Sequence, residues 1–65
     1  MTTEELCSAL EDSLAHAVAA TRALARAQLE GTSRSRSVVL AAQTSAAWEA
    51  FDLLRTELRT RLRML

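Results

Sequence analysis

Few side chains in this sequence of 65 residues suit acid–base, nucleophilic or metal chemistry. The only histidine, His16, follows Asp12 by four residues, and the only cysteine, Cys7, lies more than two helical turns before it. Residues four apart share a helix face, so Asp12 and His16 predict a surface ion pair. A zinc site needs three or four converging ligands, which this set does not supply. We therefore expect no metal site, no cofactor and no catalytic residue, and we expect Cys7 to act as a small apolar residue.

The arginines form a second group of candidate functional residues. Arg55, Arg59 and Arg63 recur every four residues, and Arg34 and Arg36 follow the only glycine. Such rows can contact phosphates or an acidic partner, or they can form a solvated face beside acidic residues. Eight arginines balance eight acidic residues, and no aromatic side chain interleaves with the row for base stacking. The balance favours the solvated face, and a nucleic-acid-binding hairpin dimer stays the alternative.

The elements that must position these residues are two helices. Thirteen alanines accompany many leucine, arginine and glutamate residues, which all favour helix, and proline is absent. Thr2 and Glu5 have capping-box spacing, Gly31 suits a helix end, and several serines that follow suit a helix start. The sequence predicts one domain, residues 1–65, with a helix at 3–30, a turn at 31–33 and a helix at 34–63.

Each helix carries an apolar seam with steps of three and four residues. The predicted first seam is Leu6, Leu10, Leu14, Ala17, Thr21, Leu24 and Gln28, and the second is Leu40, Thr44, Ala47, Phe51, Leu54, Leu58, Leu62 and Leu65. Folding the chain at the turn pairs large with large and small with small residues, and it brings acidic residues of the first helix alongside arginines of the second. An antiparallel hairpin follows. We expect Thr21 and Thr44 to face each other, each hydroxyl bonding to a carbonyl of its own helix.

A second apolar stripe flanks these seams and is wider than one hairpin can bury. It consists of Val18, Ala25 and Leu29 on the first helix with Ala41, Ser45 and Trp48 on the second. A chain this short gains only about 3–5 kcal/mol from its own core. The stripe therefore predicts a partner interface, formed with a second copy in a four-helix bundle or with a larger protein.

The expected location is the cytoplasm of a bacterium or of a cell infected by a phage. A lone cysteine fits a reducing compartment, the N-terminus does not have the form of a secretion signal, and no apolar run approaches the length of a membrane span. The use of arginine without lysine and the wealth of alanine are typical of GC-rich genomes. The sequence predicts a small, non-catalytic interaction protein that serves as an accessory subunit, adaptor or inhibitor.

Overall fold

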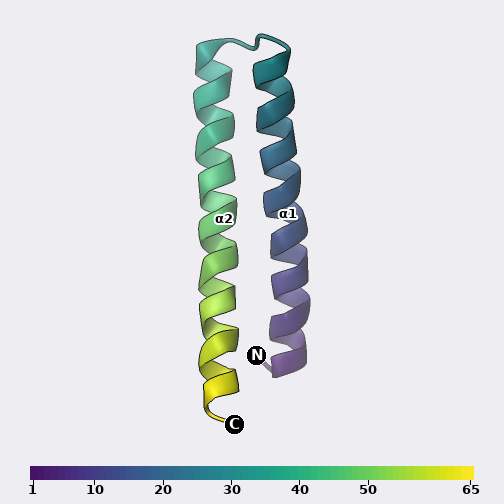
Figure 1. The fold of residues 1–65 in the computed structure, drawn as a ribbon, viewed down its shortest axis with the longest axis vertical. Helices are drawn as coiled ribbons and strands as arrows, with labels where there is room; N and C mark the ends of the chain where they lie inside the picture. The colour runs from purple at the N-terminus through teal and green to yellow at the C-terminus, as the bar shows by residue number, and fades with distance from the viewer.

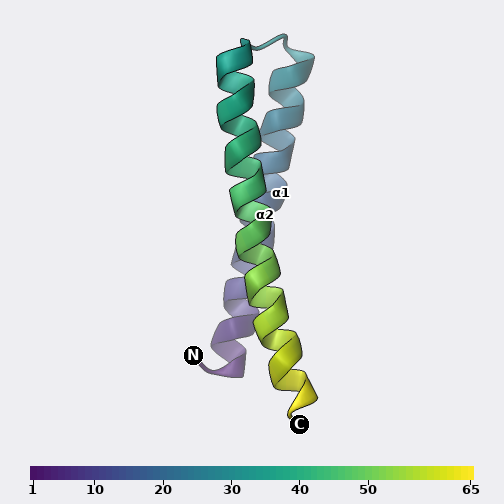
Figure 2. The ribbon, with the colours of Figure 1, turned by 90° about the vertical axis from the view of Figure 1, so that its left-hand side faces the viewer.

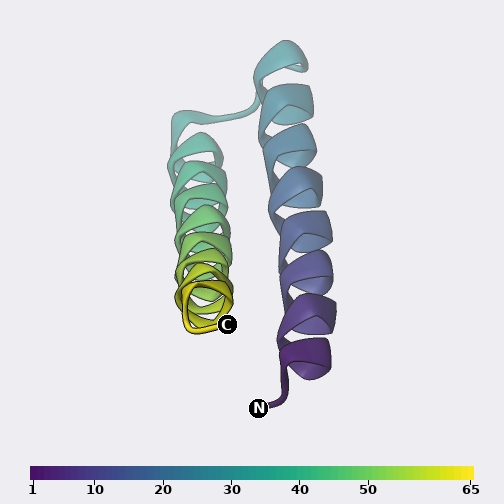
Figure 3. The same cartoon turned by 60° about the horizontal axis from the view of Figure 1, so that its bottom comes forward.

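The computed structural model describes all 65 residues, which form two α-helices joined by a short turn. Helix α1 spans Thr3–Leu29 and helix α2 spans Arg34–Arg63. The helices run antiparallel, and both chain ends lie opposite the turn, at what we call the open end (Figure 1). Figure 2 shows the helices crossing at a small angle, and Figure 3 shows the pair from the open end. The predicted all-α hairpin is confirmed.

A capping box starts α1, as the spacing of Thr2 and Glu5 predicts. The Glu5 backbone N–H donates to the Thr2 hydroxyl at 3.1 Å, and the Thr2 backbone N–H donates to the Glu5 carboxylate at 3.3 Å. Glu4 and Glu5 also place negative charge at the positive end of the helix dipole. These contacts satisfy backbone donors that the first turn of a helix leaves free.

The turn between the helices is built on Gly31, whose φ of 73° lies in the left-handed region that glycine tolerates best. The Thr32 N–H donates to the Ala27 carbonyl at 3.0 Å, and the Gly31 N–H donates to the Gln28 carbonyl at 3.3 Å. This pair of bonds is a Schellman motif. Ser33 then caps α2 by accepting the Arg36 N–H at 3.4 Å.

The seam between the helices differs from the predicted one by one residue at several positions. Along α1 the buried and half-buried positions that repeat every seven residues are Leu6, Leu10, Ser13, Ala17, Ala20, Leu24 and Ala27. Along α2 they are Ser37, Leu40, Thr44, Ala47, Phe51, Leu54, Leu58 and Arg61. The predicted seam positions Leu14, Thr21, Gln28, Leu62 and Leu65 are exposed, so these five assignments were wrong.

The physical reason is the helix period. Alternating steps of four and three average 3.5 residues per turn, which keeps a seam facing its partner along a supercoiled pair. The predicted seam of α1 began with two steps of four, from Leu6 through Leu10 to Leu14, and this drifts away from the contact line. Leu14 was assigned to the seam because it is larger and more apolar than its neighbour Ser13. In the structure Ser13 is half-buried and Leu14 is exposed.

The middle of the seam is narrow and contains a polar contact between the helices. The Thr44 hydroxyl lies 2.8 Å from the Leu40 carbonyl of its own helix and 3.3 Å from the Ala20 carbonyl of α1. The Thr21 hydroxyl donates to the Ala17 carbonyl at 2.9 Å. The predicted bonds to each threonine's own helix are confirmed. Thr21, however, lies exposed at the edge of the seam, while Thr44 is half-buried within it.

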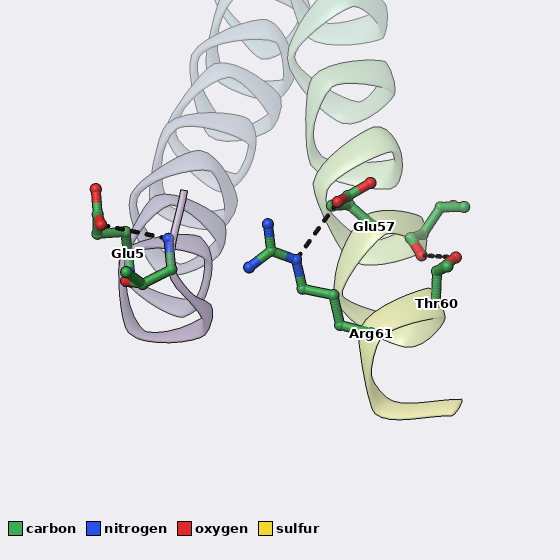
Figure 4. A network of polar contacts seen from close by, with 6 residues as sticks. Glu5, Glu57, Thr60 and Arg61 are labelled. Atoms are coloured by element: carbon green, nitrogen blue, oxygen red, sulfur yellow. Dashed lines mark hydrogen bonds and ion pairs between the residues drawn. The ribbon is translucent and has the colours of Figure 1, made fainter. Parts of the chain in front are cut away.

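The ion pairs of the hairpin form within α2. Arg55 contacts Asp52 at 3.0 Å and Arg61 contacts Glu57 at 3.4 Å. Figure 4 shows Arg61 extending from α2 toward α1 at the open end, where Glu5 is engaged in its cap. The acidic residues at the start of α1 form no ion pair with the arginines of α2.

Candidate interaction surface

One side of the hairpin carries Trp48 together with apolar side chains that flank the seam. We call it the Trp48 face, and it comprises Leu14, Val18, Thr21 and Ala25 of α1 with Ala41 and Trp48 of α2. On α1 these residues repeat at steps of four, three and four, one position after the seam. Ala41 and Trp48 lie seven residues apart on α2, and each follows a seam residue by one position. The two rows therefore flank the same side of the helix contact.

A hydrogen bond between the helices joins the two rows. The Trp48 indole N–H donates to the Thr21 hydroxyl at 2.8 Å, and Thr21 in turn donates to the Ala17 carbonyl. The indole also meets Phe51 edge to face, with ring centroids 5.8 Å apart and planes at 86°. Trp48 is thus held from two sides while its ring stays half-exposed.

This restraint bears on binding. An immobilised side chain loses less conformational entropy on association, which otherwise costs about 0.5–1.5 kcal/mol for each ordered side chain. Tryptophan is also among the residues most enriched at the centres of protein interfaces. A pre-positioned, half-exposed indole is well suited to anchor a partner.

The six residues predicted as a partner interface do not all lie equally close to this anchor. Val18 and Ala25 stand one turn on either side of Thr21, and Ala41 lies two turns before Trp48. Leu29, which is 89% exposed, lies at the last position of α1, beside the turn. Ser45 follows the seam residue Thr44 by one position, between Ala41 and Trp48, and is exposed.

Sequence reasoning missed two members of the face. Leu14 and Thr21 were assigned to the seam because they continue its steps of three and four. The structure leaves Leu14 41% exposed and gives Thr21 the bond to Trp48. A strict seven-residue repeat counted from Leu6 and Leu10 would have excluded both from the seam.

The opposite side of the hairpin is lined mainly by alanines. An open groove of ≈ 670 Å³ runs along the helix contact there, lined by His16, Ala19, Ala20, Gln43, Ala46, Ala47 and Ala50. Asp12 and His16, predicted to pair, are both exposed and form no ion pair with each other. No group of three or more histidine, cysteine or acidic side chains converges anywhere in the chain.

The predicted phosphate or acidic-partner contacts are divided between the two ends of the hairpin. Arg34 and Arg36 lie in the first turn of α2, and both are exposed. Arg55, Arg59 and Arg63 lie near the open end, where Arg55 is engaged with Asp52. The structure therefore does not bring the five arginines into one surface.

Neither helix contains a stretch that is both long and apolar enough to cross a membrane. Comparisons of the chain with models of protein families, with curated proteins and with solved structures give no match.

Proposed function

We propose that the hairpin is a non-catalytic interaction protein whose Trp48 face binds a second copy of the chain, a larger protein, or both in turn. In this role it acts as an accessory subunit, adaptor or inhibitor. Its two-helix unit dimerises into a four-helix bundle. The reducing cytoplasm, where Cys7 stays a free thiol, is the compartment that suits it.

The observation that carries the proposal is the amount of surface that the isolated hairpin exposes. Its accessible surface is 5052 Å². A compact monomer of 7.1 kDa is expected to expose about 4,100 Å². The excess of about 1,000 Å² is close to the surface of about 800 Å² that each partner buries in a protein interface of standard size.

The elongated shape of the molecule also supports association with a partner. The radius of gyration is 14.8 Å, and the hairpin measures 49 × 15 × 14 Å. A compact domain of this length has a radius of gyration of about 11 Å. Only four residues are buried, namely Leu6, Ala17, Ala27 and Ala47. Association through the Trp48 face would cover the apolar side chains that this face leaves in water.

Adjacent alanines of α2 offer a matched test of the Trp48 face. Ala41 and Ala42 are both exposed, but Ala41 belongs to the face and Ala42 points about 100° away from it. Ala41→Glu should weaken self-association at least tenfold, since it buries a carboxylate at the interface. Ala42→Glu should leave it unchanged. Sedimentation equilibrium of both variants and the wild type at micromolar concentration measures this.

The results of sedimentation distinguish a second copy of the chain from a larger protein as the partner. A wild-type protein that stays monomeric, with melting independent of protein concentration, removes the second copy as a partner and leaves a larger protein for the same face. Equal weakening by Ala41→Glu and Ala42→Glu would instead contradict the Trp48 face as the binding surface.

A second candidate, nucleic-acid binding by the arginine row of α2, is favoured by one observation. Arg59 and Arg63 are exposed and have no carboxylate partner. Phosphate contacts weaken steeply with salt, so any binding to duplex DNA or RNA through this row should fall between 50 and 200 mM salt. Arg59→Gln with Arg63→Gln should abolish it, while Ala41→Glu should leave direct contacts intact.

A further inference from the structure

The charges of the hairpin are segregated along its length, although the chain as a whole is neutral. The turn half, residues 17–48, contains Arg22, Arg26, Arg34 and Arg36 against a single acidic residue, Glu30, and so carries +3. The open half, residues 1–16 and 49–65, contains seven acidic residues against four arginines and carries −3. The hairpin is thus a rod 49 Å long with a positive and a negative end.

The ion pairs within the hairpin do not remove this polarity. Both of them, Arg55–Asp52 and Arg61–Glu57, lie in the open half, and each cancels one arginine against one carboxylate. The acidic excess there resides in the first half of α1, at Glu4, Glu5, Glu11 and Asp12. At the other end, all four arginines are exposed and none contacts a carboxylate.

The three largest apolar residues of the Trp48 face, Leu14, Val18 and Trp48, lie near the middle of the rod. Helix α1 spans Thr3–Leu29, so its midpoint is residue 16, and Leu14 and Val18 stand two residues on either side of it. Helix α2 spans Arg34–Arg63, and Trp48 lies at its midpoint. A twofold axis across the middle of this face would set Leu14 against the Val18 position of the other copy and bring the two Trp48 rings together.

The geometry points to a second copy of this chain, packed antiparallel on the Trp48 face, with the turn of each hairpin over the open end of the other. This inference rests on the proposed function and specifies its partner and orientation. In this arrangement each +3 half lies along a −3 half, and the acidic first half of α1 lies along the half of the other α1 that contains Arg22 and Arg26. A parallel dimer would set α1 of each copy along α2 of the other, which brings Arg22 and Arg26 of one copy near Arg34 and Arg36 of the other at the turn end.

The contact between the two copies of α1 and the contact between the two copies of α2 differ in how well their charges match. The contact between the two copies of α1 gains from charge along its whole length. The contact between the two copies of α2 sets Arg34 and Arg36 near Arg61 and Arg63, a repulsion that the pairing of Arg61 with Glu57 reduces. Because the halves as wholes carry opposite charge, attraction outweighs this cost. The exposed excess of about 1,000 Å² provides the area that a stable dimer needs.

Spin labels measure the orientation directly. The native Cys7 lies nine residues from the midpoint of α1, so antiparallel copies place two labels about 27 Å apart along the rod. Ser35→Cys in a Cys7→Ser background puts the label near the turn, on the exposed first turn of α2, where the separation becomes about 40 Å. A parallel dimer places both pairs of labels at equal height, within about 15 Å.

Salt provides an independent readout on the unlabelled protein. The dissociation constant of the antiparallel dimer should rise by about threefold or more between 0.05 M and 0.5 M salt. Over this range the screening length for charge interactions shortens to a few ångströms, so attraction between the oppositely charged halves weakens. A parallel dimer should respond less to salt, because attraction at its open end offsets repulsion at its turn end.

Sedimentation, label distances and salt dependence together test both the dimer and its orientation. A wild type that remains monomeric in sedimentation overturns this inference, as well as the second copy as a partner in the proposed function. A dimer that Ala41→Glu disrupts but whose labels lie at equal height, or whose dissociation constant salt does not raise, leaves the proposed function standing and overturns the antiparallel arrangement alone. Long label distances together with weakening by salt support it.

Discussion

The two halves of the hairpin hold their helices together by different means. In the open half the seam is made of large side chains, with Leu6, Leu10, Phe51, Leu54 and Leu58 between the helices. In the turn half small residues predominate, and the helices are joined by bonds from Thr44 to the Ala20 carbonyl and from Trp48 to Thr21. Apolar burial therefore stabilises the open half, and close backbone approach with hydrogen bonding stabilises the turn half.

This contrast predicts which kinds of substitution should destabilise each half. The stabilisation gained from burial is proportional to the apolar area removed from water, so truncation of large side chains should destabilise the open half. The turn half contains little side-chain volume to remove, so it should respond to enlargement and to loss of polar contacts.

The largest effect is expected from Leu6→Ala in the open half. Leu6 is the only large side chain that is fully buried, with 0% exposure. Its truncation should lower the free energy of unfolding by about 3 kcal/mol, through lost transfer energy and the cavity left behind. That is most of what a core of this size supplies, so circular dichroism should record a largely unfolded variant.

A leucine outside the seam provides the control for that change. Leu53 is 74% exposed on α2, so Leu53→Ala should alter the free energy of unfolding by less than about 0.5 kcal/mol. Equal losses for Leu6→Ala and Leu53→Ala would contradict the seam as the main source of stability in the open half.

The next largest effect is expected at Trp48, where the halves meet. Trp48→Ala should weaken self-association by about 2 kcal/mol, as removal of a central aromatic anchor does. Trp48→Phe keeps an aromatic ring but loses the N–H that bonds to Thr21, so it should cost less. Sedimentation at several concentrations separates the two, and melting temperatures that rise with protein concentration should accompany an intact interface.

Enlargement should disrupt the turn half where truncation cannot. Ala47 is 5% exposed at the helix contact, and the neighbouring Ala46 is exposed. Ala47→Leu should cost about 1–2 kcal/mol by forcing the helices apart, while Ala46→Leu should be close to neutral. Chemical denaturation of the two variants tests this, and tolerance of leucine at residue 47 would show that the helices are not in close contact there.

The smallest effect is expected from Thr44→Val. The change keeps the shape of the side chain but removes the hydroxyl that lies near the Leu40 and Ala20 carbonyls. One such bond contributes about 1 kcal/mol. Thr60→Val is the control, because the Thr60 hydroxyl bonds only to the Thr56 carbonyl of its own helix, on an exposed surface. If both variants unfold at the same denaturant concentration, the bond between the helices adds nothing.

Much of the fold could be predicted from local signals. Thr2 and Glu5 indicated the start of α1, and Gly31 indicated its end, since both depend on backbone groups only a few residues away. The pairing of the helices followed from matching side-chain sizes along two long seams. These features need no knowledge of the fine geometry of the helix contact.

The edges of the seam and the interaction surface were harder to predict. Assigning Leu14 and Thr21 to the seam ignored the supercoil, which selects Ser13 and Ala20 in spite of their smaller size. The bond from Trp48 to Thr21 joins residues that are 27 positions apart. No local pattern encodes such a contact, because it depends on how closely the two backbones approach.

The phase of the two seams has a consequence for domain swapping. Continuing the α1 spacing of four and three past Ala27 would place seam positions at 38, 41, 45 and 48. The α2 seam instead occupies Leu40, Thr44 and Ala47, one residue earlier in each case. If the turn straightened into one long helix, its apolar stripe would shift by about 100° at the junction. Two such extended chains could not keep both stripes in contact along one straight pair, so the sequence disfavours exchange of helices between copies and favours the closed hairpin.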